Sequence, residues 1–175
     1  MALRVAVFQE TPDRLAQFER IMAEAERRVL RIALRLLNNP HDAQDAAQEV
    51  FLRLYKQLGR LDEARGYDAW LYRVTVNVCR DIARKRPQAV ALEDAPEPRE
   101  HQPDLEFAER REIMQRALGR LGEKERAAVV LRDVEGLSTR EVAQILGSTE
   151  TTVRSQISTA RLKLRDFTSR LLRRR

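Results

Sequence analysis

The segment that most restricts the fold runs from residue 136 to residue 157, and its pattern predicts two helices joined by a tight turn. Ser138 precedes Glu141 by three positions, which is the spacing of a capping box at the start of a helix. Gly147 stands where the chain must leave that helix, because glycine readily adopts the left-handed backbone of such an exit. The Ser-Thr pair that follows can cap a second helix.

The second helix of this pair has one apolar side and one polar, basic side. Val153 and Ile157 are four residues apart and are expected to face the first helix. The outward positions then hold Arg154, Ser155, Ser158 and Arg161. From Ser138 to the end, nine Lys and Arg residues stand against three acidic residues, as expected of a segment that meets phosphates. The pattern favours a DNA-reading helix-turn-helix over its alternative, a plain helical hairpin in an all-helical core.

The charge of the whole chain supports an anionic partner. The 175 residues carry a net charge of +6 and the sequence pI is about 10.1, which favours nucleic acid over an anionic membrane surface. No apolar run approaches the roughly 20 residues that span a bilayer, and the first residues have too short an apolar core for a signal peptide. With Cys79 as the single cysteine, the sequence predicts a soluble protein of a reducing cytoplasm.

The first half of the chain has the apolar spacing of three helices. We expect a first helix that Thr11 caps and Pro12 begins, a second that starts at the Asn39-Pro40 pair and stops at Gly59, and a third that Asp68 caps and Pro87 closes. Strand-like alternation is absent from the sequence, so the predicted fold class is all-α, with a small helical domain over residues 1–87.

Two surfaces of this domain remain once its core is assigned. The second helix carries Asp45, Gln48, Glu49 and Leu52 on one side. A polar rim around one leucine can dock another helix, although the residues alone favour a solvated face. The third helix carries Arg73, Asn77, Arg80 and Arg84, with Tyr67 and Tyr72 nearby. Basic and aromatic residues together suit single-stranded DNA, and a basic face with its tyrosines in the core is an equal alternative.

Residues 88–106 differ in composition from the rest of the chain. They contain three prolines and six acidic residues against Arg99 alone, and such a segment predicts a flexible linker. After it, residues 107–121 and 124–134 read as two further helices. Together with the helix-turn-helix they predict a second, four-helix domain over residues 107–175.

With these elements in place, the chain resembles the bacterial sigma factors of the extracytoplasmic-function group over about residues 14–87 and 107–168. The run from Asp42 to Leu54 looks like the helix of that family that binds core RNA polymerase, and the run from Ala69 to Asp81 looks like its −10 promoter helix. The second half repeats a Leu-x-x-x-x-Arg pattern followed by Gly-Leu-Ser and the helix-turn-helix. The resemblance implies sigma region 2 in the first domain and sigma region 4 in the second.

The resemblance also assigns roles to residues of this sequence. It places Asp45, Gln48, Glu49 and Leu52 against the clamp helices of the polymerase β′ subunit, and region 4 near the β flap. It places Arg65, Tyr67, Asp68, Arg73, Asn77, Arg80 and Arg84 on the single-stranded −10 element. It places Thr151, Thr152, Arg154, Ser155, Ser158, Arg161 and Lys163 on the −35 duplex. An anti-sigma factor is the further partner it implies.

Two other classes of protein fit the sequence less well than this resemblance. A stand-alone helix-turn-helix regulator would bind duplex operator without polymerase, and the sequence lacks a heptad seam for its dimerisation. An enzyme is disfavoured because His41 and His101 are isolated and neither metal-ligand spacing nor a phosphate-binding loop is present in the sequence. Cys79 next to an apolar stripe reads as a core residue. We therefore expect a non-enzymatic protein without a cofactor or membrane insertion.

Overall fold

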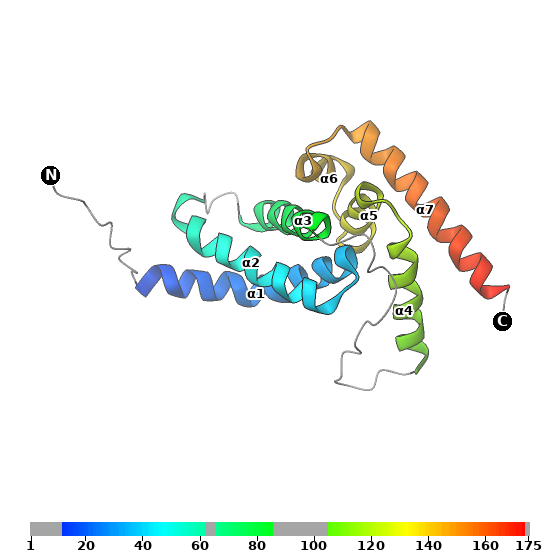
Figure 1. Ribbon diagram of the computed structural model, residues 1–175. Helices are drawn as coiled ribbons and strands as arrows, with labels where there is room; N and C mark the ends of the chain where they lie inside the picture. The colour runs from blue at the N-terminus through cyan, green and yellow to red at the C-terminus, as the bar shows by residue number, and fades with distance from the viewer. Residues whose placement is uncertain (1–11, 62–65, 86–104, 174–175) are drawn as a thin grey trace.

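A computed structural model describes residues 12–61, 66–85 and 105–173, and in these residues the fold is all-α, as predicted. The helices, labelled in Figure 1, are α1 (Pro12–Leu37), α2 (Pro40–Gln57), α3 (Asp68–Lys85), α4 (Leu105–Gly119), α5 (Glu123–Val129), α6 (Thr139–Leu146) and α7 (Glu150–Leu172). A short 3₁₀ turn, η1 (Leu58–Arg60), follows α2, and a π-helical turn, η3 (Val130–Val134), follows α5. Helices α1 to α3 form one domain and α4 to α7 the other.

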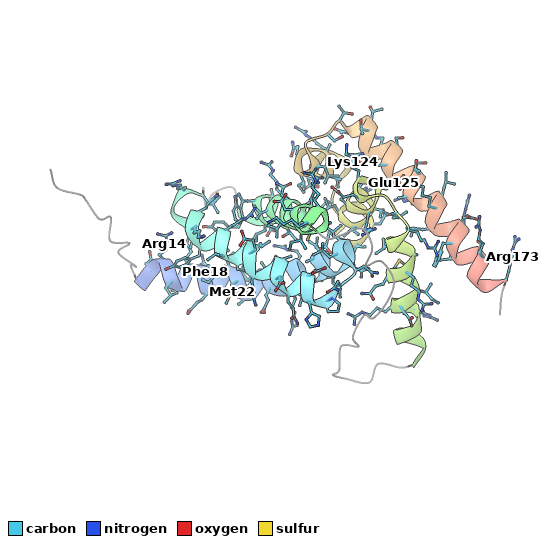
Figure 2. The ribbon with its side chains drawn as sticks, in the orientation of Figure 1. Arg14, Phe18, Met22, Lys124, Glu125 and Arg173 are labelled. Atoms are coloured by element: carbon cyan, nitrogen blue, oxygen red, sulfur yellow. The ribbon has the colours of Figure 1, made fainter. Side chains whose placement is uncertain are left out.

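The turn between α1 and α2 is built by local chemistry. The side chain of Asn39 accepts a hydrogen bond from the backbone nitrogen of Asp42 at 3.0 Å, and Pro40 takes the first helical position, where its missing N–H costs nothing. Asn38 adopts the left-handed conformation that lets the chain reverse, with φ of 55°. As a result α1 and α2 pack side by side, and the side chains in Figure 2 fill the space between them and α3.

The core of the first domain is an apolar cluster drawn from all three helices. Its most buried members include Ala25, Val29, Ala33, Ala43, Val50, Leu54, Leu71, Val78 and Cys79. The predicted apolar stripes supply most of these residues. Cys79 is 2% exposed, and burial raises the pKa of its thiol to about 12, so the core interpretation of this cysteine is confirmed.

Several predicted boundaries shift by one or two residues. Gly59 was predicted to stop α2. It lies instead inside η1, because α2 ends at Gln57 and the chain then tightens into a 3₁₀ turn. Asp68 was predicted as a cap but is the first residue of α3, and its carboxylate instead pairs with Arg28 of α1. Helix α4 begins at Leu105, two residues before the predicted start. The predicted cap Thr11, the loop residue Arg65 and linker residues 88–104 lie outside the described residues.

The helix-turn-helix forms as its sequence predicts. Ser138 Oγ accepts from the Glu141 backbone nitrogen at 3.2 Å, and Glu141 Oε2 accepts from the Ser138 backbone nitrogen at 2.7 Å, which completes the capping box. Gly147 ends α6 with φ of 60°, in the left-handed region. Thr149 caps α7, since its Oγ1 accepts from the backbone nitrogen of Thr152 at 3.1 Å.

Two features of the second domain go beyond the prediction. The expected single helix over residues 124–134 is α5 followed by the π turn η3, where the Glu135 nitrogen bonds the Val130 carbonyl at 3.1 Å. The second difference is that the core of this domain includes three residues of the first: Ile32 of α1 and Tyr72 and Val76 of α3. The sequence left a DNA-facing role and a core role open for Tyr72, and in this structure Tyr72 is 7% exposed and belongs to the core.

Candidate nucleic-acid and polymerase interfaces

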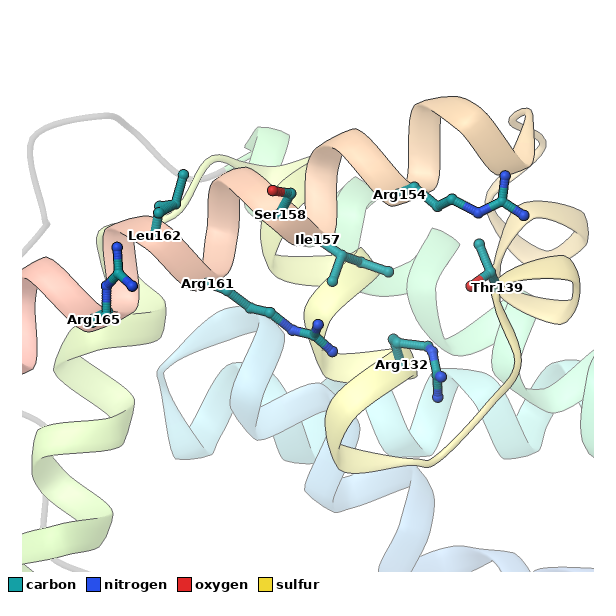
Figure 3. Close-up of a pocket in the computed structure, with 8 residues that line it drawn as sticks. All are labelled: Arg132, Thr139, Arg154, Ile157, Ser158, Arg161, Leu162 and Arg165. Atoms are coloured by element: carbon teal, nitrogen blue, oxygen red, sulfur yellow. The ribbon is translucent and has the colours of Figure 1, made fainter.

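The outward side of α7 carries a basic hollow. Val153 and Ile157 are buried against the rest of the domain, and Arg154 and Ser155 between them are exposed and face away from the core. An open hollow of about 530 Å³ lies along this side. Its lining, drawn in Figure 3, is Arg132, Thr139, Arg154, Ile157, Ser158, Arg161, Leu162 and Arg165. Four arginines at one hollow make a site for phosphates and for the acceptor edges of bases.

Helical spacing explains which predicted −35 residues meet at this hollow. The positions 151, 154, 158, 161 and 165 follow one face of α7 at steps of three and four. Arg154, Ser158 and Arg161 line the hollow from that face. Thr152 and Lys163 lie on a different face of the helix. All seven predicted −35 residues, Thr151, Thr152, Arg154, Ser155, Ser158, Arg161 and Lys163, are exposed.

Three polar lining residues were missed by the sequence analysis. Arg165 lies one helical turn beyond Arg161, so its place could have been predicted from spacing. Arg132 belongs to η3 and Thr139 to the start of α6, and both reach the hollow through tertiary packing. A stretch of sequence does not show that these two segments border α7.

Acidic neighbours orient the basic residues of α7. Asp133 pairs with Arg161 through two bonds, of 2.9 Å to Nε and 2.6 Å to Nη2, and this hydrogen bonding raises the pKa of Arg161. Glu150 pairs with Arg154 at 2.7 Å one turn away. Such exposed ion pairs are weak in water, so phosphate or a base edge can replace the carboxylate.

Lys163 is held on the other side of α7. Its Nζ donates to both carboxylate oxygens of Glu125, at 2.8 Å each, and this bond lowers the pKa of Glu125. Glu125 lies near the start of α5 and is labelled in Figure 2. The contact joins the middle of α7 to α5 and so stabilises the packing of the domain. The Lys163 side chain nevertheless stays 49% exposed at the surface.

The outward face of α3 keeps part of the predicted −10 surface. Arg73, Asn77 and Arg84 are exposed at spacings that place them on one side of the helix. Arg80 belongs to the same side and is half-buried, with its Nε 2.5 Å from Glu123 Oε1 of the second domain. Of the four basic and amide residues, three are open to solvent.

The two tyrosines near the predicted −10 site, Tyr67 and Tyr72, are packed in this structure, whereas Asp68 is exposed. The Tyr67 hydroxyl accepts from Gln17 Nε2 at 2.8 Å, so its ring is anchored to α1. The ring of Tyr72 lies under the guanidinium of Arg28 at 5.1 Å, and burial raises its pKa. Arg28 also pairs with Asp68. These contacts hold the tyrosine rings away from the face, whose accessible residues are Arg73, Asn77 and Arg84 together with Asp68.

The predicted polymerase-docking face of α2 is open. Asp45, Gln48 and Leu52 are exposed, and Leu52 keeps 47% of its surface accessible although its neighbours at Val50, Phe51 and Leu54 are buried. Glu49 is half-exposed and pairs with Arg53 at 2.7 Å. The face is thus a leucine within a polar rim on a helix whose other side is fixed in the core.

Two family models match the chain, Sigma-70 region 2 over residues 21–88 and Sigma-70, region 4 over residues 111–164. The matches coincide with the two helical domains, so the fold and its faces define an RNA polymerase sigma factor with regions 2 and 4.

The chain is similar to the ECF RNA polymerase sigma factor SigE of Mycolicibacterium smegmatis, with 36% identity over 173 residues, 93% of this chain and 66% of SigE. It is similar to SigM of Mycobacterium tuberculosis, with 34% identity over 154 residues, 87% of this chain and 76% of SigM. Among solved structures it matches CnrH, in complex with the cytosolic domain of CnrY, with a TM-score of 0.66, 27% identity and 87% of each chain covered. The chain belongs to the extracytoplasmic-function (ECF) family of RNA polymerase sigma factors.

Within residues 12–61, 66–85 and 105–173, none of the helices has the length and apolar character that crossing a membrane requires. The same part of the chain holds no group of three or more His, Cys, Asp or Glu residues that could bind a metal ion.

Proposed function

We propose that this sigma factor recruits core polymerase through α2, reads the −35 duplex through α7 and holds the separated −10 strand on α3. The observation that carries the proposal is the hollow of four arginines along the outward side of a capped helix-turn-helix. Arg154 and Arg161 can pair with guanine O6 and N7 in the major groove, and Arg132 and Arg165 border them as phosphate contacts. Ser155 and Ser158 supply smaller polar contacts.

Region 2 has the second role in this proposal. Arg73, Asn77 and Arg84 follow the phosphates of the non-template strand, and unstacked bases gain contacts that the closed duplex does not offer. The gain offsets part of the cost of separating the base pairs. The chain itself makes and breaks no covalent bond in this proposal, since RNA synthesis belongs to polymerase.

The partners follow from the exposed faces. The α2 face of Asp45, Gln48, Glu49 and Leu52 binds the β′ clamp helices, where the leucine fills an apolar contact and the polar rim selects the partner. Region 4 docks near the β flap. An anti-sigma factor is the proposed regulator, and the related CnrH, solved with the cytosolic domain of CnrY, supports a protein partner of this kind. Because the proposed partners, polymerase and promoter DNA, are in the cytoplasm, the proposed location of this protein is the cytoplasm.

Permanganate reactivity of −10 thymines tests the proposal, because the reagent modifies unstacked thymine. Core polymerase with this chain should open a cognate promoter, and Arg73→Ala/Arg84→Ala should reduce the reactivity while leaving duplex −35 binding in place. Arg154→Ala/Arg161→Ala should lose the initial promoter complex. Arg116→Ala, on the exposed side of α4, serves as the matched control and should behave as wild type.

Duplex binding by the chain alone, with no reactive thymines when polymerase is added, would instead identify a stand-alone regulator and overturn the proposal.

A further inference from the structure

Leu162 of α7 is an apolar residue on the polar side of its helix. Its side chain is 53% exposed, the largest value among the exposed large apolar residues in the described part of the chain. Leu164, two positions further on, packs against the core of the second domain. Residues two apart point to nearly opposite sides of an α-helix, so Leu162 is directed away from the core that holds Val153 and Ile157. Packing within the domain therefore does not account for a leucine at this position.

The surroundings of Leu162 distinguish it from the single exposed leucines that are common on protein surfaces. Among the eight described residues that line the basic hollow, Leu162 is the one apolar residue that is exposed, since Ile157 is 6% exposed. Figure 3 shows Leu162 and Ser158 on the outward side of α7, whereas Arg161 is turned toward Arg132 of η3. The leucine thus lies on the side of the hollow that is proposed to meet the −35 duplex.

Leu162 shares the outermost line of α7 with two serines. Ser158 and Ser155 precede it by four and seven residues, and both are exposed. Helical spacing places a cation on each side of this line, Arg161 on one side and Lys163 on the other. When a helix lies in the major groove, its outermost line faces the base edges and its sides face the phosphates of the two strands. Leu162 is therefore placed to meet a base edge rather than a phosphate.

The chemistry of the major groove limits what a leucine can contact there. The C5 methyl group of thymine is the apolar group that the base edges offer, and the other groups are hydrogen-bond donors and acceptors. A leucine against a donor or acceptor would leave that group without a partner, at a cost in free energy. Contact between the leucine side chain and the thymine methyl instead removes both apolar groups from water. The arginines beside Leu162 attract the duplex by charge, so this short-range contact can form.

We propose that Leu162 selects a thymine in the −35 element by contact with its C5 methyl group. The proposal rests on the function proposed above and deepens it, because it names one base that this sigma factor recognises. Leu162 follows Arg154 by eight residues, which is about 12 Å along the helix axis. The thymine therefore belongs to a different base pair from the one that Arg154 contacts, no more than about four steps of about 3.4 Å away.

Deoxyuridine tests this contact at the level of one methyl group, because it pairs as thymidine does and lacks the C5 methyl. A cognate promoter is first selected by wild-type holoenzyme from fragments randomised at the −35 element, and each −35 thymine is then replaced in turn by deoxyuridine. At one position the replacement should weaken binding by about fourfold, as expected for one apolar carbon group that is no longer buried. Replacement of the other thymines should have little effect.

Variants of Leu162 remove or keep the protein side of the contact. Holoenzyme with Leu162→Ala should bind the thymine and deoxyuridine promoters equally, and selection with it should lose the thymine preference at that position alone. Leu162→Met keeps an apolar side chain of similar volume and should keep the preference. Leu15→Ala, at a leucine of α1 that is 44% exposed, is the matched control and should behave as wild type. Circular dichroism checks that each variant is folded.

Equal affinity of wild type for thymine and deoxyuridine at every −35 position, or a selected element without thymine, would overturn the role of Leu162. So would a fourfold loss that persists in Leu162→Ala. Weaker binding of Leu162→Ala to core polymerase, with the thymine preference unchanged, would assign the leucine to a protein contact instead. If Arg154→Ala still relaxes base choice in these cases, the role of Leu162 alone is refuted, whereas a holoenzyme that selects no −35 sequence refutes the proposed function.

Discussion

Replacing Arg154 with alanine should weaken base recognition while leaving the free energy of unfolding almost unchanged. Arg154 pairs with Glu150 at 2.7 Å, and the two side chains are 64% and 42% exposed. An exposed pair of this spacing contributes about 0.3–0.5 kcal/mol, so Arg154→Ala should lower the free energy of unfolding by no more than about 0.5 kcal/mol. Loss of a two-bond contact to a base should cost about 1–3 kcal/mol, or about fivefold to 150-fold, at one base pair of the −35 element.

The chain supplies a matched control for this change. Arg116 and Glu112 of α4 form a pair of the same spacing and the same 2.7 Å length, with side chains 63% and 61% exposed. Arg116→Ala should therefore cost the same small amount of stability and nothing in base preference.

The assay is selection of promoter fragments, randomised at the −35 element, by holoenzyme made with wild type, Arg154→Ala or Arg116→Ala. Sequencing of the bound fragments should show relaxed choice at one position for Arg154→Ala alone. Wild-type preference at every position in that variant, or an equal loss in the control, would refute the assignment.

Three further changes test other parts of the account. Asp45→Arg should weaken binding to core polymerase about tenfold without altering the circular dichroism spectrum, and equal affinity would remove α2 as the docking face. Val153→Ala removes about two methylene equivalents from a site that is 0% exposed, so urea unfolding should show a loss of about 2–3 kcal/mol, and exposed Thr159→Ala almost none. Because burial raises the pKa of Cys79 to about 12, a thiol reagent at pH 8 should label it slowly in native protein and rapidly in denaturant; fast native labelling would contradict its burial.

The elements that the sequence predicts well are those set by neighbouring residues. Ser138 and Glu141 form their capping box, Gly147 takes the left-handed exit, and Asn39 with Pro40 begins α2. Each of these depends on chemistry within four residues, so the sequence contains the whole signal. The exposure of the α2 face around Leu52 belongs to the same group, because helical spacing separates this face from the core.

Features that depend on distant segments were not predictable in this way. The burial of Tyr72 needs α6 against α3, and the place of Arg132 in the basic hollow needs η3 against α7. The sequence left both a core and a DNA-facing role open for Tyr72, and only the packing of the second domain decides between them. The π turn at Val130 leaves the apolar pattern intact, so the pattern could not reveal it.

The most direct measurement is run-off transcription on a library of promoter fragments by core polymerase, with and without this protein. The account predicts RNA of defined length from a subset of fragments only when the protein is present, and its loss with Arg154→Ala/Arg161→Ala. Equal transcription with and without the protein on every fragment would contradict the account at its centre.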